Sequence, residues 1–464
     1  MAKLGTSENP LRVAIVGSGP AGFYAVQDFF AHKEIAVRID MFDRLPAPFG
    51  LVRNGVAPDH QKIKAVQKLY DRLAQREEFR FFGNVDFGRD LSRADLERRY
   101  HQILIACGAQ GDRTLGIPGE EFEGVHSARE FVAWYNADPD HVDDRFNLDT
   151  TGAVVVGVGN VAADVARILC RSQEELGTTD IADYALEALG AGSVRNVHVL
   201  GRRGPVQAAF SPPEIKELGE LSEAEASTLP EEMELDEYSQ AELEAAENKE
   251  VQRKLDNLLL LSGRSEPEKP KKLSVRFLVS PVEIIGDDQG RVKAVKVVKN
   301  RLVKRDDGRV GPQATDEFET IEAGLIFRSV GYYGVPLDDI PFDERAGVIP
   351  NDHGRVLDGD AHDVGLYATG WIKRGPSGLI GTNKGCAKDT VACMVEDLES
   401  GSVLNPSDPG LESIESLLRE RNVRFVTYDD WLKLDAIERE RGEALGRPRV
   451  KFTRREDFLA ALAG

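Results

Sequence analysis

The hydrophobic residues at the start of the chain predict a strand, a turn, a helix and a second strand. Residues 11–16 and 37–42 are short apolar runs, the pattern of strands that are buried on both faces. Residues 21–30 carry apolar side chains at helical spacing. Residues 17–22, between the first run and the helix, are Gly-Ser-Gly-Pro-Ala-Gly. The segment therefore predicts a strand that leads through a glycine-rich turn into a helix.

The same pattern returns further along the chain. Residues 153–156 are an apolar run, and residues 157–162 are Gly-Val-Gly-Asn-Val-Ala. A helical pattern begins at Asn160, and residues 197–200 form another apolar run. Two units of this kind predict an α/β protein with two dinucleotide-binding, Rossmann-like domains.

The remaining segments are interpreted in the same way. Residues 214–262 are rich in Glu, Ala, Leu and Lys and predict helices, with a solvated excursion over residues 219–240. The other expected strands are 102–106, then 274–279, 282–285 and 292–298 as a meander, then 326–331 and 366–370.

The two glycine-rich turns point to two different nucleotides. Such a turn lets a pyrophosphate approach bare backbone N–H groups at the positive end of a helix. Asp43 ends the second strand of the first unit, where a carboxylate accepts hydrogen bonds from a ribose. Arg202 and Arg203 follow the corresponding strand of the second unit, and two arginines suit the 2′-phosphate of NADP. We therefore assign FAD to the first unit and NADP(H) to the second.

Two dinucleotides on one chain suit hydride transfer from a nicotinamide to a flavin, so the sequence indicates a flavoprotein reductase. The order of the units predicts that the NADP domain is inserted into the FAD domain. We expect residues 1–112 to form the first part of the FAD domain and residues 113–330 the NADP domain. Residues 331–464 should complete the FAD domain and add a C-terminal tail.

The formal net charge of −20 is unevenly distributed. Residues 214–250 hold 14 Asp and Glu against 2 Lys. Basic patches elsewhere are therefore compatible with the overall charge, although nucleic-acid binding is not expected. No apolar run reaches the length of a membrane span, and residues 1–10 lack an apolar signal core. These features predict a cytoplasmic protein without a membrane span.

Cysteine and histidine spacing excludes several kinds of site. The 4 cysteines show no C-x-x-C pair, which argues against an iron–sulfur cluster and a redox-active dithiol. The histidines other than His60 show no clustered spacing, so no metal site is expected.

Longer motifs carry a family resemblance. GSGPAG, FGLVRNGVAPDH, GVGNVAADVAR, GRRGP and GWIKRGPSGLIGTNK resemble segments of ferredoxin–NADP⁺ reductases of the adrenodoxin-reductase type, and the bacterial members are the most similar. The C-terminal segment from Val426 to Arg449 also resembles the tail of that family. The resemblance covers nearly the whole chain. It implies non-covalent FAD, NADP(H), and one-electron delivery to a ferredoxin-type iron–sulfur protein.

The resemblance also implies sets of cofactor contacts. The expected FAD contacts are Gly17, Gly19, Ala21, Gly22, Asp43, Leu51, Val85, Trp371, Gly378, Leu379 and Ile380. The expected NADP contacts are Arg113, Val158, Gly159, Asn160, Val161, Arg202, Arg203, Glu214 and Gly378.

The resemblance places His60 and Glu214 near the junction of flavin and nicotinamide, so these are the expected catalytic residues. His60 would relay or position a proton, because the unperturbed pKa of histidine lies near 6.5. The alternative is a structural histidine that fixes the Pro58-Asp59 turn. Glu214 would contact the nicotinamide amide or His60, and the alternative is an acid that caps a surface helix.

Two other enzyme classes use similar folds. A flavin monooxygenase would pass electrons to oxygen, and an electron-input subunit of a larger flavoenzyme would require a cysteine-rich segment that this sequence lacks. A non-catalytic nucleotide sensor is a third alternative. An acidic ferredoxin would dock on basic groups near the flavin motifs, for which the candidates are Arg53, Lys62, Lys64, Lys373, Arg374 and Lys384.

Overall fold

The first glycine-rich turn follows β1, an interior strand of a seven-stranded sheet in the computed structural model, which describes residues 2–263 and 269–463. The strand order is β16-β17-β18-β4-β1-β2-β3. Strands β18, β4, β1, β2 and β3 are parallel, and β17 and β16 continue the sheet antiparallel. Their bounds are β1 (Leu11–Val16), β2 (Val37–Asp43), β3 (Phe79–Gly83), β4 (Gln102–Ile105), β16 (Asn351–Asp352), β17 (Arg355–Asp358) and β18 (Ala361–Ala368). Every strand of this sheet lies outside residues 113–330.

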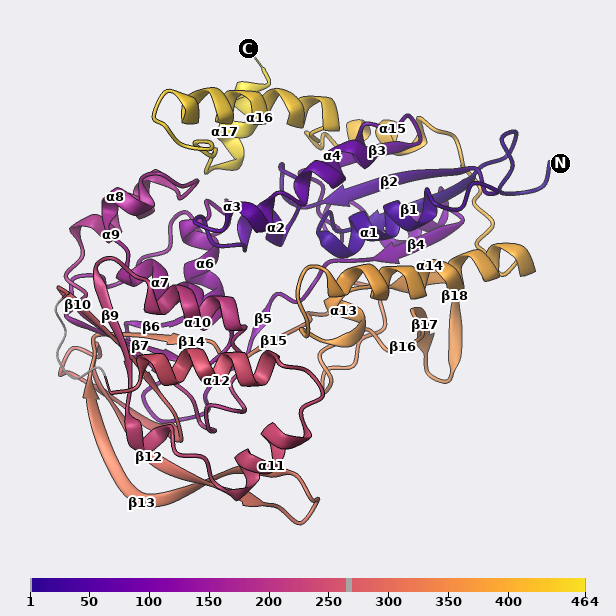
Figure 1. Cartoon of the computed structure of the whole chain (residues 1–464). Helices are drawn as coiled ribbons and strands as arrows, with labels where there is room; N and C mark the ends of the chain where they lie inside the picture. The colour runs from indigo at the N-terminus through magenta and orange to yellow at the C-terminus, as the bar shows by residue number, and fades with distance from the viewer. Residues whose placement is uncertain (1, 264–268, 464) are drawn as a thin grey trace.

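All six residues of β1 are buried because both faces of this sheet are covered. Leu11, Val13 and Ile15 face a core shared with helices on one side, whereas Ala14 and Val16 face a second core on the other. On the first side, α1 and α14 lie next to each other (Figure 1). The helices built from this part of the chain are α1 (Pro20–Phe29), α2 (Leu51–Asn54), α3 (Gln61–Lys64), α4 (Gln67–Ala74), α5 (Arg93–Glu97), α13 (Trp371–Arg374), α14 (Thr382–Ser400), α15 (Ser413–Glu420), α16 (Tyr428–Glu443) and α17 (Arg455–Ala461).

The second glycine-rich turn belongs to a six-stranded, fully parallel sheet of order β6-β14-β7-β8-β10-β9. Its strands are β6 (Val125–Ser127), β7 (Gly152–Val156), β8 (Asn196–Leu200), β9 (Ala224–Thr228), β10 (Lys271–Arg276) and β14 (Leu325–Arg328). The helices of this half are α6 (Ala128–Tyr135), α7 (Asn160–Cys170), α8 (Gln173–Leu176), α9 (Asp183–Ala191), α10 (Pro212–Gly219), η1 (Pro230–Glu232), α11 (Glu237–Ala245) and α12 (Glu250–Leu261).

The helices of this half pack on one face of the six-stranded sheet, and a three-stranded antiparallel sheet covers the other face. It consists of β11 (Val279–Gly286), β12 (Val292–Lys304) and β13 (Val310–Glu322). Val154 and Val156 of β7 pack against Val295 and Val297 of β12. The fold class predicted from the sequence, two Rossmann-like units in an α/β protein, is therefore confirmed.

Two details of the predicted elements are wrong. Residues 274–276 belong to β10 in the parallel sheet and not to a meander, because a short apolar run does not show which sheet will bury it. Residues 224–228 form β9 at the edge of that sheet, although the surrounding segment was expected to be helical or solvated. The alternating burial of β9 is a strand signal that the high content of Glu and Ala concealed.

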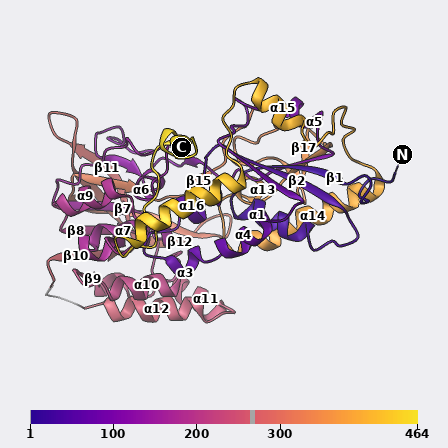
Figure 2. The same cartoon turned by 90° about the horizontal axis from the view of Figure 1, so that it is seen from above.

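The chain crosses between the two sheets at a short ribbon. Strand β5 (Gly111–Asp112) pairs antiparallel with β15 (Tyr332–Tyr333). This ribbon lies next to the expected boundaries at 112/113 and 330/331, whose positions remain a prediction. Seen from above, α16 lies across the boundary between the two halves (Figure 2). Within the described residues, no helix combines the length and apolarity needed to cross a membrane.

Candidate active site between the two nucleotide-binding turns

The first turn has the shape that a pyrophosphate requires. Gly17 has a φ of +111°, and a Cβ there would lie 2.5 Å from the Ala106 carbonyl oxygen, so only glycine fits. Gly19 is the N-cap of α1, and no side chain caps this end of the helix. A Cβ on Gly19 would meet no protein atom within 4 Å. The start of α1 therefore carries no side-chain cap and is open beside Gly19, which suits the approach of a phosphate to its N–H groups.

Asp43 holds this turn to the end of β2. One carboxylate oxygen of Asp43 accepts hydrogen bonds from the Ser18 backbone N–H at 2.9 Å and from the Ser18 hydroxyl at 2.5 Å. The other oxygen accepts one bond, from the Leu45 N–H at 2.9 Å. That second oxygen can accept one more hydrogen bond. The predicted contact between Asp43 and a ribose therefore remains compatible with the protein's own contacts.

The structure brings distant flavin motifs to the first turn. A Cβ on Gly370 would lie 2.6 Å from the Ala21 Cβ, so the turn before α13 lies against the start of α1. A Cβ on Gly50 would lie 2.8 Å from the Gly19 Cα, which places the start of α2, with the exposed Leu51, beside the same turn.

The other predicted FAD contacts lie in three places. Val85 is buried after β3. Trp371 begins α13 and donates its indole N–H to the Ser377 carbonyl oxygen at 3.2 Å. Gly378, Leu379 and Ile380 form the turn that leads to α14, and the Leu379 side chain is exposed.

The second turn repeats the geometry of the first. Gly157 has a φ of +133° and lies against the Ser329 carbonyl oxygen. Gly159 is the N-cap of α7, and a Cβ there would again meet no protein atom within 4 Å. The Asn160 amide oxygen accepts a hydrogen bond from the Ser211 N–H at 2.8 Å, and the Val158 carbonyl accepts one from the Ala209 N–H at 2.8 Å. The turn, including Val161 in α7, is therefore fixed and open to a phosphate.

Arg202 and Arg203 follow β8, as the sequence predicts for a 2′-phosphate site. Both side chains are exposed. The backbone beneath them is fixed, because the Arg202 carbonyl accepts a hydrogen bond from the Asn300 amide at 2.9 Å and the Arg203 carbonyl accepts one from the Leu278 N–H at 3.1 Å. Two guanidinium groups are thus presented to solvent from a rigid turn. Arg113 is also exposed and lies directly after the ribbon strand β5.

His60 lies beside two acids of α10, Glu214 and Glu217. Its Nε2 lies 2.8 Å from a carboxylate oxygen of Glu217 and 4.0 Å from Glu214. Glu214 instead accepts a hydrogen bond from Arg167 at 3.2 Å. Glu217 is therefore the nearer acid and Glu214 lies at the limit of ion-pair distance, so the expected roles of His60 and Glu214 remain a prediction. Glu214 and Glu217 lie one helical turn apart on α10, so the i, i+3 spacing was the signal that could have identified Glu217.

Arg167 of α7 organises the acids around His60. Its side chain is fully buried and donates to Asp59 at 2.7 and 3.0 Å, to Asp164 at 2.7 Å and to Glu214 at 3.2 Å. Asp59 precedes His60 in the flavin half, whereas Arg167 lies in the NADP half. This network therefore joins the two halves directly beside His60.

The network shifts the ionisation of its members in opposite directions. Burial raises the pKa of Asp164 and of Glu214, and for Glu214 the neighbouring Asp164 carboxylate adds to the increase. Burial would also raise the pKa of Asp59, but the hydrogen bonds and charge of Arg167 lower it to about 2. Glu214 and Asp164 can therefore take up a proton more readily than exposed acids, while Asp59 stays ionised.

The acids beside His60 are also close enough together to resemble a set of metal ligands. Donor atoms of His60, Glu214 and Glu217 lie within 4.8 Å of one another. However, Arg167 Nη1 lies 3.2 Å from Glu214 and 3.8 Å from Glu217. A fixed positive charge at these distances opposes a cation, so the cluster is better explained as an ion-pair network.

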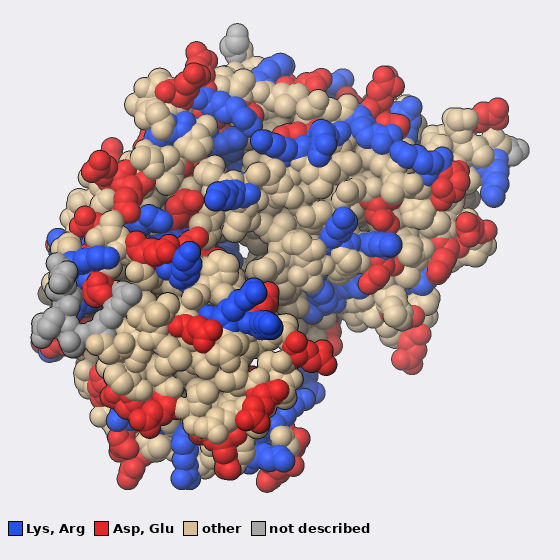
Figure 3. Space-filling model, in the orientation of Figure 1, with Lys and Arg blue, Asp and Glu red and all other residues tan. Residues whose placement is uncertain are grey.

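Two of the expected docking cations are not available at the surface. Arg53 is buried against Glu438, and Lys64 is buried against Asp180 at 2.7 Å. Their assignment to a docking surface is wrong, because sequence does not show which cation has a buried partner. The candidates that remain at least partly exposed are Lys62, Lys373, Arg374 and Lys384. On the face shown in Figure 3, Lys and Arg side chains lie around the hollow near the centre.

Two open glycine-rich turns, each following a parallel strand of its own sheet, define a pyridine-nucleotide-dependent flavoprotein. The family model described as pyridine nucleotide-disulphide oxidoreductase matches residues 11–225. NADPH:adrenodoxin oxidoreductase, mitochondrial, of Arabidopsis thaliana is 41% identical over 98% of this chain and 96% of its own length. NADPH-ferredoxin reductase FprA of Mycobacterium leprae is 41% identical, with 96% and 97% covered.

A solved structure supports the same assignment. Mycobacterium tuberculosis FprA in complex with NADPH superposes with a TM-score of 0.92 at 40% identity, covering 98% of this chain and all of the other. The chain belongs to the family of adrenodoxin-reductase-type NADPH-ferredoxin reductases. The predicted resemblance, the reductase class and the cofactors FAD and NADP(H) are thereby confirmed. The assignment of individual residues to each cofactor remains a prediction.

Proposed function

We propose that this protein takes electrons from NADPH and delivers them, through non-covalent FAD, to a ferredoxin-type iron–sulfur protein. The observation that carries the proposal is the pair of open glycine-rich turns, one on each of the two large sheets, with the His60 network joining the two halves. The relatives are named for ferredoxin and adrenodoxin as their redox partners, which supports an acceptor of the same kind.

The residues of the chain divide into binding, orienting and proton-holding groups. The free N–H groups at the starts of α1 and α7 bind the two pyrophosphates. Arg202 and Arg203 bind the 2′-phosphate and so select NADPH over NADH. When bound, FAD supplies the ability to accept a hydride and to release electrons singly.

Proton handling is assigned to the acids around His60. The His60 ring is held by Glu217, and the raised pKa values of Glu214 and Asp164 let these carboxyls hold a proton near the same ring. Orientation by Arg167 keeps the acids in place. Hydride transfer depends chiefly on such orientation.

The proposal is tested by anaerobic mixing with NADPH. The bound flavin should lose its yellow absorbance, and oxidised ferredoxin added afterwards should restore it. Heat denaturation should release FAD and not FMN, because the first turn and Asp43 suit an adenine dinucleotide. No bleaching by NADPH in the FAD-loaded protein would refute the proposal.

A flavin monooxygenase is separated from a ferredoxin reductase by its productive acceptor. The reduced protein should pass electrons to ferredoxin much faster than to oxygen, and added organic substrates should not accelerate oxygen consumption. A cytoplasmic location also remains a proposal, which fractionation of the source cells with antibody detection would test.

A further inference from the structure

Within residues 2–263 and 269–463, the chain connects the two halves through a two-stranded ribbon. Among the described residues, the chain passes between the sheets at β5 and β15, which pair over two residues each. A ribbon this short leaves rotation of one half against the other weakly opposed. Other contacts must therefore set the angle at which the two nucleotide-binding turns face each other.

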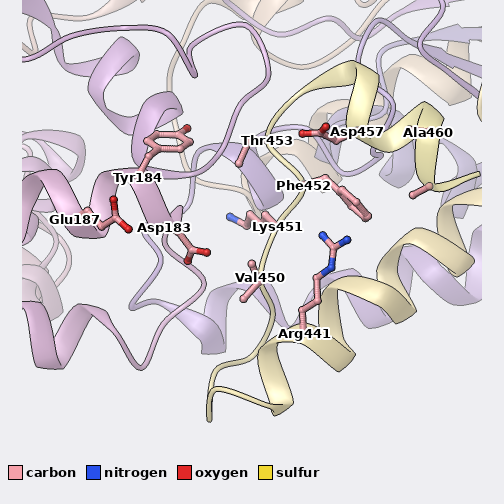
Figure 4. A pocket seen from close by; sticks show the side chains of 11 residues that line it. Asp183, Tyr184, Glu187, Arg441, Val450, Lys451, Phe452, Thr453, Asp457 and Ala460 are labelled. Atoms are coloured by element: carbon pink, nitrogen blue, oxygen red, sulfur yellow. The ribbon is translucent and has the colours of Figure 1, made fainter.

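One such contact is made by residues 447–455, which we call the strap. The strap follows α16, which packs on the flavin half through Trp431 and Phe49. Figure 4 shows it passing between α9 and the helices α16 and α17, beside a groove of about 670 Å³. The C-terminal end of the chain thus lies over the boundary between the halves, as Figure 2 also shows.

Lys451 is the central contact of the strap, and its side chain is only 1% exposed. Its ammonium donates to the Arg53 carbonyl at 3.2 Å, in the flavin half. It also donates to the Asn136 carbonyl at 3.1 Å, and it lies 3.3 Å from Asp180, both in the NADP half. One buried cation therefore touches both halves at once.

Arg447 adds a second anchor on the NADP side. Its guanidinium donates to the Thr179 carbonyl at 2.9 Å, to the Ile181 carbonyl and to Asp183 at 2.5 Å. These hydrogen bonds fix the position of the Arg447 guanidinium on the NADP half, because backbone carbonyl acceptors cannot change rotamer as side chains do.

The charge balance around Lys451 argues against a role in stability alone. Asp180 faces two buried ammonium groups, Lys451 and Lys64. Burial pulls the pKa of Lys451 well below its ordinary value, so the site disfavours its charge. Apolar residues would hold a strap at lower cost, whereas buried polar networks fix a particular geometry.

We propose that Lys451 is a positioning residue for the reductase reaction, and that the strap is a latch that holds the NADP half at one angle to the flavin half. The inference rests on the proposed function. Misplacement of the order of 1 Å between reacting groups costs about 100-fold in rate. Loosening the latch should therefore slow flavin reduction by NADPH while leaving each half folded.

The test compares Lys451→Met with wild type, both loaded with FAD. Methionine keeps most of the side-chain volume, and Asp180 keeps Lys64 as its partner, so its buried carboxylate is not left unpaired. The matched control is Lys433→Gln, which removes an exposed cation outside the strap whose contact, Asp430, lies in the same helix α16. Stopped-flow measurement should show flavin reduction by saturating NADPH at least tenfold slower in Lys451→Met and unchanged in Lys433→Gln. Reoxidation by ferricyanide, which needs only the flavin half, should be equal in all three proteins.

Hydrogen exchange supplies a readout that is independent of turnover. In Lys451→Met, with and without FAD, exchange should be faster at residues 177–183 and 447–455, while the strands of both sheets stay protected. Equal reduction rates in Lys451→Met and wild type would overturn the inference, as would equal slowing of reduction and reoxidation. Loss of FAD or of folding would also overturn it, because Lys451 would then serve the fold itself. Failure of NADPH to reduce the wild type would instead refute the proposed function.

Discussion

Replacing Arg202 and Arg203 by Ala should convert a reductase that prefers NADPH into one with little preference between NADPH and NADH. Both side chains are exposed, and the turn beneath them is held by backbone contacts to Asn300 and Leu278. The substitutions therefore remove two guanidinium groups without removing any hydrogen bond that fixes the turn.

The size of the effect follows from the hydrogen bonds to the 2′-phosphate that the two substitutions would remove. A hydrogen bond to a charged group contributes about 1.5–3 kcal/mol, which is roughly 10- to 150-fold in kcat/KM for each arginine. The two arginines share one phosphate and their effects are not additive, so we expect on the order of 100-fold or more for the double variant. The kcat/KM for NADH should change little, because its ribose carries no phosphate.

The assay is ferricyanide reduction with each nucleotide at constant ionic strength. Arg301→Ala is the control, since Arg301 is another exposed arginine of the NADP half and its guanidinium contacts only Gln313 among the described residues. An equal loss with NADPH and NADH in the double variant would show that the arginines support the fold. An equal loss in Arg301→Ala would show a general effect of surface charge.

The other predictions concern the acids near His60 and the docking surface. Glu217→Gln should slow flavin reduction roughly tenfold at saturating NADPH, because His60 loses a charged partner. Glu214→Gln should mainly raise the KM for NADPH. Equal effects of the two substitutions in stopped-flow experiments would contradict the closer contact of His60 with Glu217. Asp59, with a pKa lowered to about 2, stabilises the fold fully above its ordinary pKa near 4, and this contribution of about 2 kcal/mol is lost as pH falls towards 2. Asp59→Asn should lack that part of the pH dependence in urea unfolding, and an unchanged profile would refute the assignment. Ferredoxin-dependent cytochrome reduction should fall with salt more than ferricyanide reduction does, and a parallel loss would exclude docking on the cations that are at least partly exposed, which are Lys62, Lys373, Arg374 and Lys384.

The sequence by itself determined the local elements of both nucleotide-binding turns. A run of apolar residues followed by Gly-x-Gly and a helical pattern specifies a strand, a tight turn and a helix, because each requirement is met by neighbours in sequence. Gly17 and Gly157 both have the positive φ that such turns need. The positions of Arg202 and Arg203 after β8 follow from the same local logic.

Contacts between distant residues were decided only by the tertiary structure. His60 and Glu217 meet across 157 positions; the i, i+3 spacing on α10 makes Glu217 a candidate beside Glu214, but it does not show which of the two acids His60 reaches. Strand β10 could join a meander or a parallel sheet until its neighbours β8 and β9 were known. The type of a residue determines which hydrogen bonds and ion pairs its side chain can form, but its partner depends on which elements the fold places beside it.

Which charged residues are buried was also decided only by the tertiary structure. Arg53 and Lys64 are basic residues near the flavin motifs and were therefore candidates for a docking surface. The fold instead buries them against Glu438 and Asp180. Glu438 and the strap residue Lys451 come from the far end of the chain, so their contacts with the flavin half could not be predicted from spacing. Turns and helices are set by interactions within a few residues, whereas ion pairs and domain angles depend on packing that exists only once both sheets have formed.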